Sequence, residues 1–246
     1  VMKTYRIAVI AGTSDATDLI TSLPKSYEVT AFVATPYGKE ILNGTNCHVH
    51  VGRLDADGFS IALSGFDAVL DASHPFAVVV TETVKAVCQA KQIPYYRIGR
   101  PTLQYDYEKL YSVPTKEAAA AWLSAVSGNL FFTVGVNTLP FYAEQVKEFA
   151  ARSFARVLDT PSSHQAAEAI PAQFWFAMPP YSVEETVQFL RKHKIAVLIS
   201  KDSGARGGVP EKMEAASIVG IPVLLIQSPE VSHFGSYGGE NNENSF

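Results

Sequence analysis

Short runs of apolar residues alternate with longer amphipathic segments along almost the whole chain. In the first hundred residues, apolar runs that predict strands cover residues 7–10, 29–33, 47–51, 68–70 and 95–97. Amphipathic segments that predict helices lie between them, at residues 15–23, 37–43, 56–63 and 77–91. Strands joined by helices of this length predict parallel βαβ units, because parallel neighbours need a long crossover. Four such units predict one complete α/β domain.

The alternation breaks at residues 99–103 and then resumes. Residues 104–113 are typical of a linker or an edge strand. Further strands are predicted at residues 129–134, 153–157, 174–177, 196–200 and 222–226, and helices at 116–125, 163–169, 183–192 and 211–219. We therefore expect two α/β domains with mainly parallel sheets, at residues 1–103 and 104–231, and a ligand cleft between them. Residues 232–246 are rich in Gly, Asn, Glu and Ser and predict a disordered tail.

Composition and charge exclude several classes of protein. Of the 246 residues, 47% are hydrophobic and 18% charged, which suffices for a substantial core without a disulfide or a metal. The net charge of −4 argues against a nucleic-acid partner. No apolar run approaches the roughly 18 residues of a membrane span, and the one near the start is too short for a signal peptide. Cys47 and Cys88 lack metal-ligand spacing and fit a reduced, cytoplasmic protein.

Ligands of open α/β sheets bind beyond the carboxyl ends of the strands, so the residues that follow each predicted strand are candidates for a site. After the first strand, Gly12 lets the backbone approach a ligand. Thr13 or Ser14 can cap the next helix, whose N-terminal amides favour an anion. The turn lacks the G-x-G-x-x-G pattern, so a capped turn without a ligand is an equal alternative.

A second candidate site follows the strand at residues 68–70. Asp71, Ser73 and His74 precede Pro75, which suits the first turn of a helix. We expect Asp71 and His74 to lie together at the sheet edge, either as a capping cluster or as ligand contacts. No second histidine or carboxylate lies at metal-ligand spacing, so the sequence predicts no metal site.

A third candidate site follows the strand at residues 196–200, where Lys201, Ser203 and Gly204 begin a glycine-rich loop. Lys201 and Lys212 can neutralise an anion that the amides of the loop surround, although a flexible loop without function is the alternative. No G-K-[ST] closes the loop as in a Walker motif. Because the sequence also lacks a nucleophile elbow, it favours hydride transfer or a cofactor-dependent transferase reaction over hydrolysis.

Taken together and in this order, these motifs resemble the precorrin-6A reductase family of cobalamin biosynthesis (CobK/CbiJ). The resemblance spans about residues 5–230. The matching segments are Gly12-Thr13-Ser14-Asp15-Ala16, Gly52-Arg53-Leu54, Asp71-Ala72-Ser73-His74-Pro75-Phe76-Ala77, Ile93-Pro94-Tyr95-Tyr96-Arg97 with Arg100-Pro101, Pro179-Pro180-Tyr181-Ser182, Lys201-Asp202-Ser203-Gly204, and Lys212 with Ala215-Ala216 ahead of Gly220-Ile221-Pro222-Val223.

The resemblance implies two Rossmann-like domains and an oxidoreductase that acts on a C=C bond. Its substrate would be precorrin-6A or cobalt-precorrin-6A, reduced to the 6B form by NADPH, with NADH as the alternative. The implied cofactor-binding residues are Gly12, Thr13, Ser14, Lys201, Ser203 and Gly204. The implied contacts to the carboxylate-rich substrate are Arg53, Asp71, Ser73, His74, Arg97, Arg100 and Lys212. His74 and Lys201 are the candidates for a catalytic role.

The chain departs from the family pattern at several positions. Ala11, Asp15 and Thr17 replace a glycine, a glutamate and an arginine, and two further arginines are replaced by Val136 and Ser228. These losses leave the choice of nicotinamide and the carboxylate contacts open. Two other classes of function also stay open: a two-lobed small-molecule sensor without catalysis, and a cofactor-dependent transferase of tetrapyrrole metabolism. The transferase would need an acidic residue after the second strand, where residues 34–36 provide none.

Overall fold

The computed structural model describes residues 4–99, 104–204 and 207–228. The chain divides into two compact units, with the division between Arg100 and Pro101. The expected domain boundary after residue 103 and the expected tail at residues 232–246 fall outside the described residues and stay predictions, as does the ligand cleft. No helix in the described ranges is long and apolar enough to cross a bilayer.

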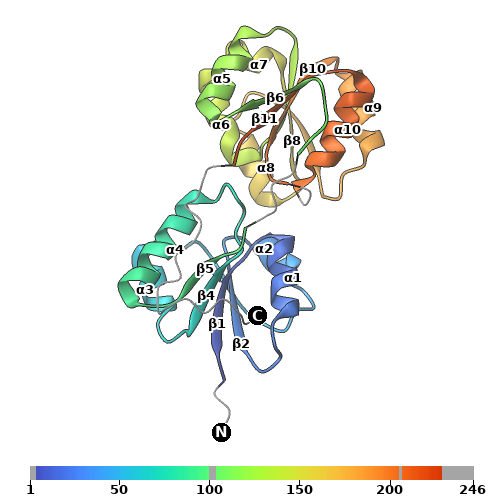
Figure 1. The fold of residues 1–246 in the computed structure, drawn as a ribbon. Coiled ribbons are helices and arrows are strands. Elements are labelled where there is room, and N and C mark those ends of the chain that lie inside the picture. Colours follow the sequence, from blue (N-terminus) through green and yellow to red (C-terminus); the bar gives the residue numbers. More distant parts are fainter. Residues whose placement is uncertain (1–3, 100–103, 205–206, 229–246) are drawn as a thin grey trace. The chain divides into compact units, whose positions relative to one another are not determined.

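Unit 1 contains a five-stranded parallel sheet with the strand order β3-β2-β1-β4-β5 (Figure 1). Its elements are β1 (Arg6–Ile10), α1 (Ser14–Ser22), β2 (Glu28–Val33), α2 (Pro36–Ile41), β3 (His48–Val51), α3 (Ala56–Ala62), β4 (Ala68–Asp71), α4 (Val78–Lys91) and β5 (Tyr95–Arg97). Every strand and helix predicted for this part of the chain is present. The chain winds from β1 out to β3 and then returns to the other side of β1, so the winding reverses between β1 and β4.

The central strand β1 is buried on both faces from Ile7 to Ile10, which explains the unbroken apolar sequence of these four residues. Ala8 and Ile10 belong to the core cluster that packs under α3 and α4. Ile7 and Val9 point to the opposite face and pack with α1. Helices on both faces are what a parallel sheet requires.

Unit 2 contains a six-stranded parallel sheet with the strand order β6-β11-β10-β7-β8-β9 (Figure 1). Its elements are β6 (Leu110–Val113), α5 (Lys116–Ala125), β7 (Asn129–Thr133), η1 (Val136–Thr138), α6 (Leu139–Gln145), α7 (Phe149–Arg152), β8 (Ser153–Leu158), α8 (Pro161–Ala167), β9 (Gln173–Ala177), α9 (Val183–Lys192), β10 (Ile195–Lys201), α10 (Val209–Val219) and β11 (Val223–Ile226). The winding of this sheet reverses between β7 and β10. The two α/β folds confirm the predicted fold class.

Two features of unit 2 were not fixed by the hydrophobic pattern. The segment that predicted a linker or an edge strand contains the edge strand β6. The helices η1, α6 and α7 between β7 and β8 had no predicted counterpart. They have three, seven and four residues and follow one another between β7 and β8.

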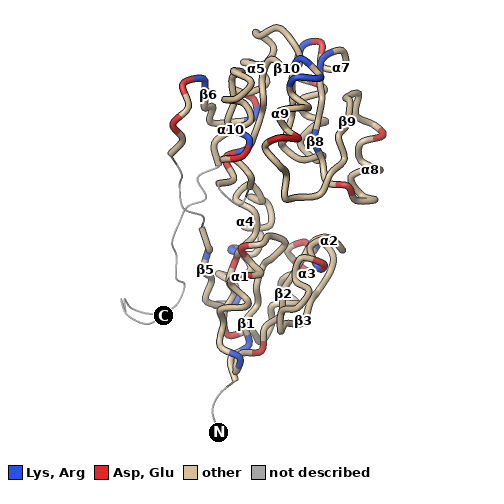
Figure 2. The backbone as a smooth tube through the Cα atoms, turned by 90° about the vertical axis from the view of Figure 1, so that its right-hand side faces the viewer, with Lys and Arg blue, Asp and Glu red and all other residues tan. Residues whose placement is uncertain are grey.

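Charged residues lie mainly outside the strands of the two sheets (Figure 2). Within the strands, Arg6 and Glu28 are exposed first residues. The other charged strand residues lie at or near the carboxyl ends: Asp71, Arg97, Arg156 and Lys201. Because a strand interior is apolar and ligands bind at carboxyl ends, these four residues mark the candidate site.

Candidate functional site

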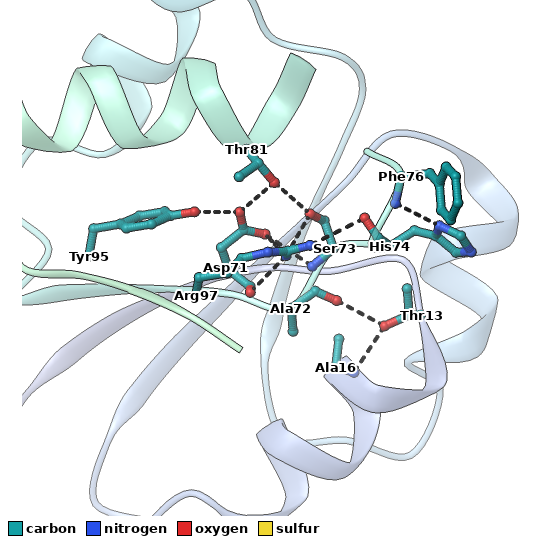
Figure 3. A network of polar contacts seen from close by, with 10 residues as sticks. All are labelled: Thr13, Ala16, Asp71, Ala72, Ser73, His74, Phe76, Thr81, Tyr95 and Arg97. Atoms are coloured by element: carbon teal, nitrogen blue, oxygen red, sulfur yellow. Dashed lines mark hydrogen bonds and ion pairs between the residues drawn. The ribbon is translucent and has the colours of Figure 1, made fainter. Parts of the chain in front are cut away.

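In unit 1, the loops after β1 and β4 adjoin at the reversal of winding. Thr13 Oγ1 donates to the carbonyl oxygen of Ala72 at 2.9 Å, and it accepts from the N–H of Ala16 at 3.3 Å as the N-cap of α1 (Figure 3). Gly12 has φ +108°, which favours glycine, and no atom lies within 4 Å of where a Cβ would be. A ligand can therefore approach the backbone of this loop closely.

Asp71 is the centre of a buried polar network (Figure 3). Its side chain is fully buried, and its Oδ2 accepts from Tyr95 Oη at 2.7 Å and from Thr81 Oγ1 at 2.9 Å. Its Oδ1 accepts from the N–H of Ser73 at 3.0 Å and pairs with Arg97 Nη1 at 2.9 Å. Burial, reinforced by the Asp71 charge, raises the pKa of Tyr95, so this phenol stays a donor.

Arg97 connects the end of β5 to the loop after β4. Its Nη1 also donates to Ser73 Oγ at 3.1 Å, and its Nη2 donates to the carbonyl oxygen of His74 at 3.3 Å. Asp71, Ser73 and Arg97 are therefore joined to one another inside unit 1, with only 7% of the Arg97 side chain exposed. Their expected contacts to a substrate stay predictions. The geometry supports a positioning role, in which they hold the backbone at His74.

His74 is half-buried, and its carbonyl oxygen is hydrogen-bonded to the Arg97 guanidinium of this network. Its Nδ1 accepts from the N–H of Phe76 at 3.2 Å, so the neutral ring carries its proton on Nε2. The other substrate contacts expected in unit 1 are Arg53 and Arg100. Arg53 is exposed in the loop after β3, and Arg100 lies outside the described residues.

In unit 2, the loops after β7 and β10 adjoin in the same way. Lys201 is the last residue of β10, and its Nζ donates to Thr138 Oγ1 at 2.9 Å across the reversal of winding. Burial, with a smaller contribution from the charge of Lys116, lowers the pKa of Lys201. Ser203 and Gly204 follow as buried residues of the loop. The structure therefore brings Lys201, Ser203 and Gly204 together at a strand end.

Lys212 approaches the same strand from α10. Only 6% of its surface is exposed, and its Nζ donates to Ser200 Oγ and to the carbonyl oxygen of Gly207, both at 3.1 Å. Burial above all, with the charge of Arg156 next, lowers its pKa to about 7. Because neighbouring strand residues point to opposite faces, Lys201 and Lys212 lie on opposite faces of β10.

The sequence analysis missed two buried cations of unit 2, Arg152 and Arg156, which are 8% and 5% exposed. Arg152, the last residue of α7, donates to the backbone carbonyl oxygens of four residues, so its donors are used within the fold. Arg156 lies in β8. Its guanidinium carbon lies 3.8 Å from the ring centroid of Tyr181 and 5.1 Å from that of Trp175. Its Nη1 donates to Thr186 Oγ1 at 3.0 Å, and burial lowers its pKa to about 10. The available signal was a single arginine in the otherwise uncharged strand sequence S-F-A-R-V-L.

The candidate residues thus form two groups, one in each unit. The group in unit 1 comprises Thr13 and the loop after β4. The group in unit 2 comprises Lys201 on one face of the sheet and Lys212 and Arg156 on the other. Among the residues that the structure describes, no three His, Cys, Asp or Glu side chains could hold a metal ion together. Both groups offer backbone amides and cations at strand ends, an arrangement suited to a dinucleotide or a polycarboxylate.

Comparisons with known proteins give a family, related sequences and a solved structure of the same fold. The model of the family described as precorrin-6x reductase CbiJ/CobK matches residues 6–241. The chain is 33% identical over 237 residues to a cobalt-precorrin-6A reductase of Methanothermobacter thermautotrophicus, with 92% of this chain and 77% of the relative covered. It is 29% identical to a cobalt-precorrin-6A reductase of Priestia megaterium, with 92% of each chain covered. A solved structure of CobK precorrin-6A reductase shares the fold, with a TM-score of 0.73 at 22% identity over 93% of this chain and 90% of that chain.

Proposed function

Since this chain belongs to the precorrin-6x reductase CbiJ/CobK family, we propose that it reduces the cobalt-precorrin-6A macrocycle to its 6B form with a reduced nicotinamide. The observation that carries the proposal is the family match over residues 6–241, which includes the strand ends of both units. Membership makes the chain a reductase of cobalamin biosynthesis. The choice of the cobalt form follows the names of the relatives described above.

The strand-end loops fit a dinucleotide. When bound, the nicotinamide supplies the hydride. We propose that Gly12, Thr13 and Ser14 hold its phosphates, because the Gly12 backbone is approachable and α1 begins there with a capped N-terminus. Lys201, Ser203 and Gly204 offer a cation and backbone amides of the same kind in unit 2.

We propose NADPH as the cofactor. An acidic residue at the end of the second strand of a dinucleotide fold hydrogen-bonds the ribose 2′-hydroxyl of NADH, and it would repel the 2′-phosphate of NADPH. The residues after β2 are Ala34 and Thr35, so this repulsion is absent from unit 1.

The carboxylates of the macrocycle need cations and donors. Arg53 is exposed and reaches solvent from the loop after β3, while Asp71 and Arg97 hold the backbone from which His74 projects. We propose that Arg53, His74 and Lys212 contact the substrate and that Asp71, Ser73 and Arg97 position the loop. His74 and Lys201 remain the candidates for a proton donor.

We also propose a cytoplasmic location. Cys47 and Cys88 are both free thiols. Cys88 is buried in α4, and burial, with a contribution from Asp71, raises its pKa to about 12, which keeps it protonated and unreactive. Unpaired cysteines of this kind suit a reducing compartment.

The test is an anaerobic assay that follows nicotinamide absorbance with each of four pairs: NADPH or NADH, with cobalt-precorrin-6A or precorrin-6A. We expect oxidation of NADPH that depends on the macrocycle and is faster with the cobalt form. Tight binding of both ligands without any oxidation would instead support the sensor. Modification of the macrocycle with no consumption of nicotinamide would support the transferase.

A further inference from the structure

Unit 2 buries two cations on one face of its sheet. Arg156 follows Phe154 by two residues, so its side chain lies on the face where Phe154, Leu190 and Met213 form the core under α9 and α10. Lys212 comes from α10 and reaches the same face at Ser200. Arg156 is 5% exposed and Lys212 is 6% exposed.

Within the described ranges, every hydrogen-bond partner of these two cations is neutral. Arg156 donates to the hydroxyl of Thr186, and Lys212 donates to Ser200 Oγ and to the carbonyl oxygen of Gly207. Neither cation forms an ion pair with a carboxylate of the described residues. Buried charges that lack an opposite charge are strongly unfavourable, so this arrangement calls for an anion.

The carboxylates that act on the pair from a distance already have other partners or lie on the surface. Glu185 is exposed at the start of α9, and its Oε2 accepts from Ser182 Oγ at 2.9 Å. Glu211 is an exposed residue in the first turn of α10. Both raise the pKa of their neighbouring cation, but burial and the proximity of Arg156 to Lys212 still leave the pKa of Lys212 near 7.

The aromatic rings around Arg156 fix the direction of its guanidinium. The guanidinium carbon lies 3.8 Å from the ring centroid of Tyr181, which follows β9. It lies 5.1 Å from the ring centroid of Trp175 and 5.8 Å from that of Phe131. Such stacking holds the plane of the guanidinium while its N–H groups stay available as donors. One of these groups serves Thr186, and a guanidinium has five. Arg156 therefore keeps donors for a further acceptor.

The position of the pair fits a ligand site. Lys212 lies over the end of β10 and Arg156 over β8, and β7 is the strand between them. The winding of the sheet reverses between β7 and β10, which is where open α/β sheets bind ligands. The two cations thus flank the end of β7.

We propose that Arg156 and Lys212 together bind one oxyanion of the ligand, a carboxylate of the macrocycle or a phosphate of the nicotinamide dinucleotide. The proposal rests on the proposed function, because those are the two anionic ligands of the reaction. Under this proposal, Arg156 and Lys212 both bind the ligand directly, at the same oxyanion. The negative charge of the bound ligand then offsets the repulsion between the two cations.

The test compares the wild-type chain with Lys212→Met, which keeps the length of the side chain and removes the charge. Isothermal titration calorimetry measures the affinity for NADPH and for cobalt-precorrin-6A separately. We expect one of the two dissociation constants to rise at least about thirty-fold. The ligand that is affected identifies the source of the oxyanion. Lys192→Met, which removes an exposed charge from α9, is the matched control and should leave both constants unchanged.

Thermal melts without ligand separate a binding role from a structural one. Removing one of two buried like charges should leave the melting temperature of Lys212→Met unchanged or raised, since no carboxylate loses its partner. A lowered melting temperature with both affinities unchanged would overturn the proposal.

If Lys212→Met does not fold, Arg156→Lys tests the same claim, because it keeps the charge and loses the planar fork. We expect an affinity loss of at least about tenfold for the same ligand, and unchanged affinity would contradict the subsite.

The outcome is separable from that of the proposed function. If the wild-type chain binds both ligands but oxidises no NADPH, the reductase proposal fails, while a loss of affinity in Lys212→Met still supports the subsite. If turnover occurs and both variants bind like the wild type, the reductase proposal stands and the subsite is wrong.

Discussion

Asp71 is the residue on which the strand-end geometry of unit 1 depends most. Its buried carboxylate accepts from Tyr95, Thr81 and Ser73 and pairs with Arg97. Asp71→Asn leaves the guanidinium without its counter-charge and should lower the free energy of unfolding by about 3–5 kcal/mol, as when one partner of a buried ion pair is removed. Urea denaturation measures this loss. Tyr95→Phe removes one donor and should cost about 1.5–3 kcal/mol, and equal losses for the two variants would argue against the ion pair.

His74 is where a binding role and a capping role can be told apart. We expect His74→Ala to raise KM for the macrocycle more than it lowers kcat, because the half-buried ring lies at the end of a strand where the ligand must enter. Thermal melts of the variant should show little change, since the bond that His74 Nδ1 accepts from the N–H of Phe76 is local, within two residues of the chain. Wild-type kinetics with a lowered melting temperature would show that His74 is structural.

Lys212 should leave a signature in the pH dependence of stability. Its pKa is about 7 in the folded chain, mainly because it is buried, and about 10.4 in an unfolded chain. Between these values the unfolded state binds more protons, so the free energy of unfolding rises with pH through this group. Below pH 7 the lysine is charged in both states and its unfavourable contribution is complete. In urea titrations without ligand, the stability advantage of Lys212→Met over the wild type should therefore shrink from pH 7 to pH 10, and a constant difference would contradict this environment.

At the scale of elements, the side chain of Thr13 joins the loops that follow β1 and β4, in addition to the backbone pairing of the two strands. Thr13 caps α1 and bonds to the carbonyl oxygen of Ala72 in the neighbouring loop. Thr13→Ala should cost about 0.5–2 kcal/mol for the cap and about 1 kcal/mol more for the second bond. Thr13→Ser keeps both bonds and should be nearly neutral, with denaturant midpoints as the measurement. If serine and alanine proved equally damaging, the methyl group and not the hydroxyl would be what matters.

The elements themselves follow from the sequence to an uneven degree. Strands β1 and β10 contain the apolar runs at residues 7–10 and 195–199, followed closely by glycine or polar residues. Both their presence and the loops at Gly12 and Lys201 could therefore be predicted. The short helices α6 and α7 could not, because their residues are placed by packing, as where Phe149 and Tyr142 meet Phe132 of β7. The hydrophobic pattern within a segment predicts only the structure that the segment's own residues favour. The contacts that place α6 and α7 are made with residues elsewhere in the sequence.

At the scale of the whole molecule, some residues of the candidate site could be predicted from the sequence and others could not. Strand-end positions identified Thr13, His74 and Lys201 without knowledge of their partners. Arg156 was missed because its environment is assembled from Thr186 in α9 and from Tyr181 after β9, both distant in the sequence. Likewise, nothing in the sequence around Asp71 shows that its carboxylate is used inside unit 1. A residue type and its position can be read from the chain, but its partners come from the fold.

The most direct test of the reductase assignment follows the hydride itself. NADPH that carries deuterium at the transferable position of the nicotinamide C4 is incubated anaerobically with the enzyme and cobalt-precorrin-6A, and the macrocycle is analysed by mass spectrometry. Hydride transfer predicts one deuterium in each molecule of the 6B product, and none when the opposite C4 position is labelled. A reduced product without deuterium from either position, or an unchanged macrocycle, would contradict the assignment.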